Sequence, residues 1–291
     1  MSRRPSGGLP CHWACRASAR LANSVPRRSA ADREALQEML VAAAVCPATP
    51  LLIPEVASGA APDLDEVRAA AHTAVRRLVA SGAELLVVLA ADADGGEGIT
   101  AAPLAGSLRS FGVDLAVGAS AGSQPAGPGP DDCSGLLVAA WLLDREPVGS
   151  TRRSGWRIGA LTTTDQCLEI GRVLADRASR VALLVMADGS ARRTEKAPGY
   201  LDPRAAGFDD ETANILAAAD AKALAAVDST TASELLMLGR APLQALAGAA
   251  TVDRQSQLHQ SQPPRPWRGD LLAYAAPFGV GYFVAAWEPQ P

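Results

Sequence analysis

Three short runs of purely apolar residues constrain the fold of this chain more than any other feature. They are Leu40–Val45, Leu85–Leu89 and Val181–Met186. Each run has the length of a strand and none alternates with polar residues, so each predicts a strand that is buried on both faces. Strands of this kind are typical of parallel sheets that carry helices on both sides. The chain is therefore expected to be an α/β protein.

The segments between these runs predict helices and further strands. Apolar residues recur at helical spacing between Asp63, which is expected to be the N-cap, and Gly82, where the helix is expected to stop. This helix would join the first two strands by a right-handed crossover. Further helices are expected near residues 133–143, 165–178, 209–227 and 232–249, a strand near 156–161, and a closing hairpin from 271–275 and 281–287. We expect a single α/β domain over residues 39–291, with a mixed, largely parallel central sheet flanked by helices.

Composition narrows the class of protein. The chain has 291 residues, of which 48% are hydrophobic and 20% charged, as in ordinary globular proteins. Its net charge of -4 gives no basic surface for nucleic acid or for an anionic membrane, and no apolar run is long enough to span a bilayer. Five scattered cysteines form no disulfide framework. We expect a soluble, cytoplasmic protein with a small-molecule ligand and no nucleic-acid or membrane partner.

The first 38 residues differ from the rest of the chain. They carry seven Arg and three acidic residues, are rich in Ser, and show no periodic apolar pattern. We expect residues 1–38 to form a disordered N-terminal extension.

Polar residues follow the three buried strands, at the points where each strand ends. These residues are Thr49 and Glu55 after the first strand, Asp92 after the second, and Asp188, Ser190 and Arg192 after the third. Because the carboxyl ends of parallel strands share one edge of a sheet, we expect these side chains to converge on one crevice.

Five segments, most of them at these strand ends, resemble motifs of one known superfamily. The segments are Cys46–Glu55, Val87–Asp92, Ala187–Arg192, Ala197–Pro203 and Phe208-Asp209. In this order they are similar to motifs of the class III extradiol ring-cleavage dioxygenase (LigB-like) superfamily. The resemblance covers most of residues 40–287 and implies that superfamily's α/β fold.

The resemblance also implies a catalytic apparatus, which this sequence only partly contains. The superfamily binds Fe(II) with two histidines and a glutamate, and a further histidine acts as acid and base. In this sequence the two histidine ligands align with Ala48 and Asp92, the acid/base residue with Ala191, and the glutamate loosely with Glu234. The superfamily further implies assembly with like or unlike subunits, so a homodimer is a possible state.

The three histidines of the chain match none of these positions. His12 lies in the N-terminal extension, His72 on a predicted helix and His259 in a polar, Pro-rich break. The Fe(II) cofactor is therefore doubtful here, because alanine can neither coordinate a metal nor transfer a proton.

Two hypotheses follow from the sequence. The first is a divergent extradiol dioxygenase-like protein with a degenerate Fe(II) site, which is non-catalytic or binds a small ligand. The alternative is an enzyme, either a dioxygenase-like oxidoreductase or a metal-assisted enzyme that uses Asp92, Asp188 and Glu234.

The same residues serve as candidates under both hypotheses. Asp188 and Ser190 are the candidate catalytic residues, and Asp92 and Glu234 are the candidate metal ligands. The candidate residues of the substrate pocket are Thr49, Glu55 and Arg192.

A nucleotide site is less well supported. The loop Gly95–Gly98 follows a strand, but it lacks the G-x-G-x-x-G spacing that brings a backbone close to a pyrophosphate.

Overall fold

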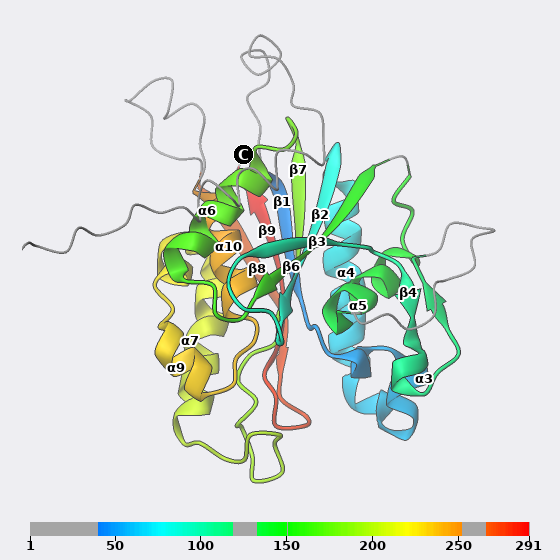
Figure 1. The fold of residues 1–291 in the computed structure, drawn as a ribbon, viewed down its shortest axis with the longest axis vertical. Helices are drawn as coiled ribbons and strands as arrows, with labels where there is room; N and C mark the ends of the chain where they lie inside the picture. Colours follow the sequence, from blue (N-terminus) through cyan, green and yellow to red (C-terminus); the bar gives the residue numbers. More distant parts are fainter. Residues whose placement is uncertain (1–39, 119–132, 150, 252–265, 291) are drawn as a thin grey trace, which may run out of the picture.

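The computed structural model of the chain describes residues 40–118, 133–149, 151–251 and 266–290. Within these residues a seven-stranded sheet stands between two layers of helices (Figure 1). The α/β fold with a mixed, largely parallel central sheet is therefore confirmed. The expected N-terminal extension, residues 1–38, lies outside the described residues.

The sheet has its parallel strands in the middle and antiparallel strands at both edges. Its strand order is β3-β6-β2-β7-β1-β9-β8. The four central strands run parallel to one another: β6 (Arg152–Gly159), β2 (Leu85–Asp92), β7 (Val181–Met186) and β1 (Leu40–Cys46). The edge strands run antiparallel to their neighbours: β3 (Ile99–Ala102), β9 (Tyr282–Pro289) and β8 (Trp267–Ala275).

The three apolar runs form the centre of this sheet, as the sequence predicts. All residues of β1 and β7 are buried, and β2 is buried over its first six residues. Successive side chains of a strand point to opposite faces, so each strand contributes to two cores. In β7, for example, Leu183 and Val185 face one layer of helices, whereas Leu184 and Met186 face the other.

The first helical layer, on the right in Figure 1, follows β1 in the sequence. It is built from η1 (Pro50–Leu52), α3 (Pro54–Ala57), η2 (Ser58–Leu64), α4 (Asp65–Ala80) and α5 (Ser134–Leu143). Helix α5 is buried from Gly135 to Leu143. A small unit that the sequence analysis missed packs beside it: β4 (Gly106–Ser107), η3 (Leu108–Phe111) and β5 (Ala116–Val117).

The second layer, on the left in Figure 1, covers the other face of the sheet. It contains α6 (Thr164–Ala175), α7 (Arg204–Ala218), α8 (Ala221–Ala225), α9 (Ser229–Glu234) and α10 (Arg240–Ala250). The sequence predicted two long helices where α7 to α10 lie. The first is interrupted at Ala219, with φ 50°, and the second at Leu236, with φ 57°, because left-handed residues end a helix.

Helices α6 and α10 pack through their glycines. A Cβ atom at Gly171 of α6 would lie 1.8 Å from the carbonyl oxygen of Ala245 in α10. A Cβ atom at Gly248 would lie 2.1 Å from the carbonyl oxygen of Leu168. Only glycine permits so close an approach of two helix backbones, and this approach sets the position of α10 against the sheet.

The described residues contain no helix that is both long enough and apolar enough to cross a membrane.

The glycine contact gives a matched pair of substitutions. Gly171→Ala is expected to lower the free energy of unfolding by ~1–3 kcal/mol, because the new methyl group forces two backbones apart. Gly207→Ala, in α7, has no heavy atom within 4 Å of the new Cβ and should raise stability by ~0.5–1 kcal/mol. Urea denaturation of both variants measures the difference. Equal effects of the two substitutions would contradict the close packing of α6 on α10.

Candidate functional site

The exit loops of β1 and β7 part at the carboxyl end of the sheet. The chain leaves β1 toward the α4 layer, whereas it leaves β7 toward the α7 layer. Such a switch point between neighbouring parallel strands opens a crevice, in which α/β proteins commonly bind their ligands. The polar residues after β1 and β7 are therefore the first candidates for a site.

Asp188 bridges the two exit loops. Its Oδ1 accepts a hydrogen bond of 2.9 Å from the N–H of Ala48, and the N–H of Thr49 also donates to this carboxyl group. The residue keeps part of its surface exposed. Burial of the carboxyl group raises the pKa of Asp188 to about 7. The two N–H groups lower this pKa, but their effect is smaller than that of burial. Asp188 therefore exchanges its proton close to neutral pH.

Tyr282 and Thr49 complete the surroundings of Asp188. Tyr282 begins β9 and forms an isolated antiparallel bridge with Asp188 beyond the end of β1. Its phenol is hydrogen-bonded to the Thr49 side chain, and both residues are buried. Burial raises the pKa of Tyr282 to about 12, and the Asp188 charge adds to this rise. Tyr282 is therefore a neutral hydrogen-bonding group at any physiological pH.

Asp92 lies on the same face of the sheet as Asp188. In the pairing of β2 with β7, Ala90 is opposite Met186. Asp92 comes two residues after Ala90, and Asp188 comes two residues after Met186. The carboxylate of Asp92 is bound by other residues of the chain. Its Oδ2 lies 3.5 Å from Nη1 of Arg157, and its Oδ1 accepts a 3.1 Å hydrogen bond from the N–H of Gly95.

The N-terminus of α5 lies over these strand ends. A Cβ atom at Gly135 would lie 2.9 Å from Cβ of Ala90, and 3.3 Å from Cβ of both Ala48 and Met186. Cys133, the N-cap residue of α5, donates from its Sγ to the carbonyl oxygen of Ala91 at 3.4 Å. The N-terminus of α5 therefore covers the carboxyl ends of β1, β2 and β7.

Burial raises the pKa of the Cys133 thiol. The nearby charge of Asp92 acts in the same direction, while N–H groups of α5 and the Arg157 charge oppose it. Cys133 is thus a protonated thiol near neutral pH, which makes it a weak nucleophile.

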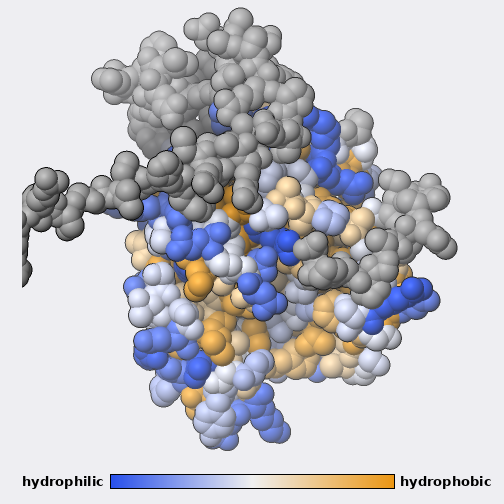
Figure 2. Space-filling view, in the orientation of Figure 1, coloured by the Kyte–Doolittle hydropathy of each residue, from blue (hydrophilic) through white to orange (hydrophobic). Residues whose placement is uncertain are grey.

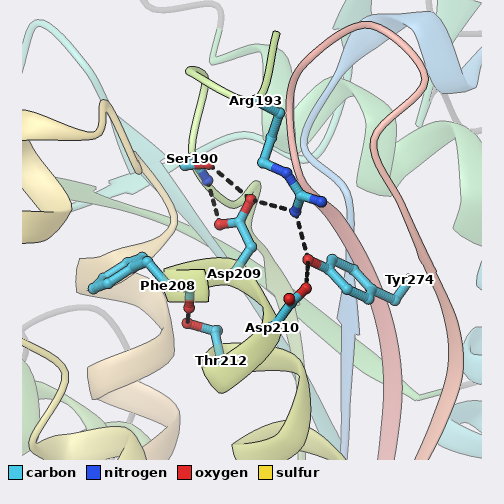
Figure 3. A network of polar contacts seen from close by, with 7 residues as sticks. All are labelled: Ser190, Arg193, Phe208, Asp209, Asp210, Thr212 and Tyr274. Atoms are coloured by element: carbon cyan, nitrogen blue, oxygen red, sulfur yellow. Dashed lines mark hydrogen bonds and ion pairs between the residues drawn. The ribbon is translucent and has the colours of Figure 1, made fainter. Parts of the chain in front are cut away.

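Ser190 takes part in a buried network on the opposite side of the loop (Figure 3). Asp209 of α7 is fully buried and accepts two hydrogen bonds from Ser190, one from its N–H at 2.8 Å and one from its hydroxyl at 2.7 Å. Ser190 is also fully buried. No surface of Ser190 is open to a ligand, so its position does not support the catalytic role that the sequence predicted.

Arg193 extends this network to strand β8. Its Nη1 lies 3.2 Å from Oδ2 of Asp209 and also donates to the hydroxyl of Tyr274, which in turn donates to Asp210 at 2.6 Å (Figure 3). Desolvation raises the pKa of Asp209, whereas Ser190 and Arg193 oppose this shift. The network fixes the loop after β7 to α7 and β8.

Two glycines allow the loop to lie against Asp209. A Cβ atom at Gly189 would be 2.8 Å from Oδ1 of Asp209, and one at Gly281 would be 2.5 Å from Oδ2. The N–H of Gly189 donates to the carbonyl oxygen of Gly281 at 2.7 Å. Larger residues would displace the loop that positions Asp188.

The remaining candidates lie away from this crevice. Glu234 ends α9, is exposed, and forms a 2.7 Å ion pair with Arg204. Arg192 packs beside Gly199, on the side of the loop that faces the segment after α9. Glu55 is exposed on α3. The structure therefore brings Thr49 and Asp188 into contact and places Asp92 at the end of the neighbouring strand, whereas the contacts of Arg192 and Glu234 are with other parts of the chain.

The residues at the carboxyl edge do not fit the Fe(II) site that the resemblance implies. Ala48 and Ala191 offer no ligand atom, and the carboxylate of Asp92 is held by Arg157. Across the described residues, no three His, Cys, Asp or Glu side chains are grouped so that they could hold a metal ion.

No histidine of the described chain supplies the missing ligand. His72 lies on α4, 3.4 Å from Glu146 and with its ring centroid 5.5 Å from that of Trp141. His12 and His259 lie outside the described residues.

Two residues of the crevice were missed by sequence reasoning. Tyr282 begins a strand that is far from Asp188 in the sequence, and no local sequence pattern indicates that the two residues meet. Arg157 could have been found from the sequence, since it is a charged residue within an otherwise buried stretch of β6. A charge in such a place needs a partner of opposite sign, here Asp92 on the neighbouring strand.

Comparisons with known proteins give a structural similarity only. No protein-family model matches the chain, and no curated protein matches it significantly. Among solved structures, the chain is similar to the crystal structure of the uncharacterized protein JW3007 from Escherichia coli K12. The two share 13% sequence identity with a TM-score of 0.45, over 85% of this chain and 99% of that one. At this level the similarity does not indicate a function.

The raised pKa of Asp188 predicts a dependence of stability on pH. Between the unfolded value of 3.8 and the folded value of about 7, the folded chain holds a proton that the unfolded chain has lost. Asp188 therefore makes stability fall by about 1.4 kcal/mol per pH unit over this range. Asp188→Asn removes this dependence.

Denaturation of the wild type and of Asp188→Asn at pH 4 to 8 tests this linkage. Between pH 4 and pH 7 the free energy of unfolding of the wild type should fall by about 2–4 kcal/mol relative to that of the variant. Above pH 7 the difference between the two should stay constant. A difference that stays constant across the range would show that Asp188 titrates normally.

Proposed function

We propose that this chain is a small-molecule-binding protein whose ligand occupies the crevice between the exit loops of β1 and β7. The observation that carries the proposal is the position of Asp188. Its carboxyl group is buried at the switch point of the parallel strands, while the residue as a whole is partly exposed. It is held by Ala48 and Thr49 and lies beside Tyr282, and the N-terminus of α5 packs against Ala48.

The groups at this crevice suit hydrogen bonding with a ligand. Asp188 accepts hydrogen bonds when it is ionised, and it donates one when it is protonated. Because its pKa is about 7, it can take either form at small cost near neutral pH. The partly exposed Asp92–Arg157 pair offers a fixed charge pair on the same face. Such a site can orient a polar molecule without a metal.

Under this proposal the protein does not cleave aromatic rings. Ring cleavage by the superfamily that the chain resembles depends on imidazole ligands, and alanine occupies two of the positions that align with histidine. The ion pairs of Asp92 with Arg157 and of Glu234 with Arg204 occupy the remaining carboxylates. The chain would then keep a binding crevice without the ring-cleavage chemistry.

A second candidate function is acid–base catalysis by Asp188. A pKa of about 7 suits a group that must both accept and donate a proton, and Asp92 follows the neighbouring strand on the same face. Glu234 does not belong to this second candidate, since its partner Arg204 lies at the start of α7.

Metal analysis separates these functions from a dioxygenase. The full chain is incubated anaerobically with Fe(II), desalted, and measured for iron content and for oxygen uptake with catechol. We expect less than about 0.1 iron per chain and no oxygen uptake, because a metal site needs a full set of ligands. Stoichiometric iron that is lost in both Asp92→Ala and Glu234→Ala would overturn the proposal.

A thermal-shift screen of polar small molecules tests the binding site. Ligands raise the melting temperature by mass action whatever the reaction type. We expect compounds that stabilise the wild type and Asp114→Asn, a control in the exposed pair with Arg109, but that have little effect on Asp188→Asn. Compounds that stabilise Asp188→Asn equally well would place the site elsewhere.

A further inference from the structure

Strand β9 changes its pairing partner at the switch point of the sheet. It pairs with β1 up to Val45, which lies opposite Ala285. At its first residue, Tyr282, the strand forms an antiparallel bridge with Asp188 instead. The backbone of Tyr282 therefore lies against the loop that carries Asp188, beyond the point where the chain leaves β1.

The side chain of Tyr282 lies on the same face of the sheet as that of Asp188. It belongs to the core beneath the first helical layer, as does Met186 at the end of β7. Asp188 follows Met186 by two residues, and side chains two residues apart in an extended chain share a face. Burial raises the pKa of Tyr282, and the charge of Asp188 raises it further. The phenol and the carboxyl group are therefore close enough to interact.

The hydroxyl group of Tyr282 depends on a partner within the protein. A tyrosine can also lie at a surface of mixed hydrophilic and hydrophobic residues, such as the one in Figure 2, and Tyr200 is 63% exposed. Tyr282 is only 2% exposed, and a buried hydroxyl group costs free energy unless it is hydrogen-bonded. Its partner is the side chain of Thr49, which is also buried. The phenol therefore ties the start of β9 to the exit loop of β1.

Thr49 connects this phenol to Asp188. Its Oγ1 accepts a hydrogen bond of 3.4 Å from the N–H of Leu51, so the side chain also caps η1. Its own N–H donates to the carboxyl group of Asp188, beside the 2.9 Å hydrogen bond from the N–H of Ala48. The direction of both N–H groups depends on the position of the exit loop of β1. A loop that loses its contact with β9 would hold the carboxyl group less firmly.

We propose that Tyr282 is a positioning residue of the ligand site: its phenol fixes Thr49, and Thr49 keeps the N–H groups of the β1 exit loop directed at Asp188. The inference rests on the proposed function, because it names the residue that sets the position of Asp188 in that site. Tyr282 acts through Thr49 and need not touch the ligand. The carboxyl group of Asp188 reports this positioning without any ligand, so the two proposals can fail separately.

NMR titration of the Asp188 carboxyl carbon in the ligand-free full chain tests the inference. Against the effect of burial, the N–H groups of Ala48 and Thr49 lower the pKa of Asp188. Tyr282→Phe weakens their hold, so the midpoint should rise by about 0.5 or more above that of the wild type. Thr49→Val removes the other partner of the same hydrogen bond and should raise the midpoint by a similar amount. The double variant should show no larger rise, because the two substitutions break one interaction.

Thr162→Val is the matched control. Thr162 is fully buried, and its Oγ1 accepts a 2.9 Å hydrogen bond from the N–H of Gly98 beyond the end of β6. Loss of this hydroxyl should lower the urea midpoint without moving the titration of Asp188.

The titration alone decides the inference. A midpoint within about 0.1 of the wild type in Tyr282→Phe or in Thr49→Val would overturn it, as would an equal rise in Thr162→Val. Should Tyr282→Phe fail to fold, Thr49→Val gives the answer. A thermal-shift screen without any compound that acts through Asp188 would overturn the proposed function and leave a raised midpoint as support for the positioning role.

Discussion

The buried carboxylate of Asp209 is the constraint on which the carboxyl edge of the sheet depends. It binds the N–H and hydroxyl of Ser190 and the guanidinium of Arg193, and so ties the loop after β7 to helix α7. A buried charge of this kind is tolerated only because all of its partners are present. With the loop held on that side, the nearby Asp188 turns its carboxyl group toward the exit loop of β1.

The loop after β7 lies between two carboxyl groups, those of its own Asp188 and of Asp209 in α7. Both carboxyl groups are buried enough for desolvation to raise their pKa. Asp209 is saturated by a cation and two donors, whereas Asp188 is held by the backbone N–H groups of the β1 exit loop and keeps exposed surface. The first is committed to the fold. The second is held by backbone N–H groups alone, and this difference is why we propose the ligand site at Asp188.

The sequence predicts the parts of the structure that local pattern determines. The strands of Leu40–Val45 and Val181–Met186 follow from apolar runs, and the meeting of Thr49 with Asp188 follows from the shared edge of parallel strands. The break between α9 and α10 and the arrival of Tyr282 depend on tertiary packing, which no local spacing encodes. The burial of Ser190 against Asp209 could not be predicted either, because nearby residues of a turn can face opposite sides.

The most direct test of the account is the titration of the Asp188 carboxyl carbon by NMR, assigned by comparison with Asp188→Asn. The account predicts a midpoint near pH 7, because the crevice desolvates a carboxyl group that backbone N–H groups stabilise only in part. A midpoint below about pH 5 would show a solvated or ion-paired carboxylate, and would contradict a ligand site built around Asp188.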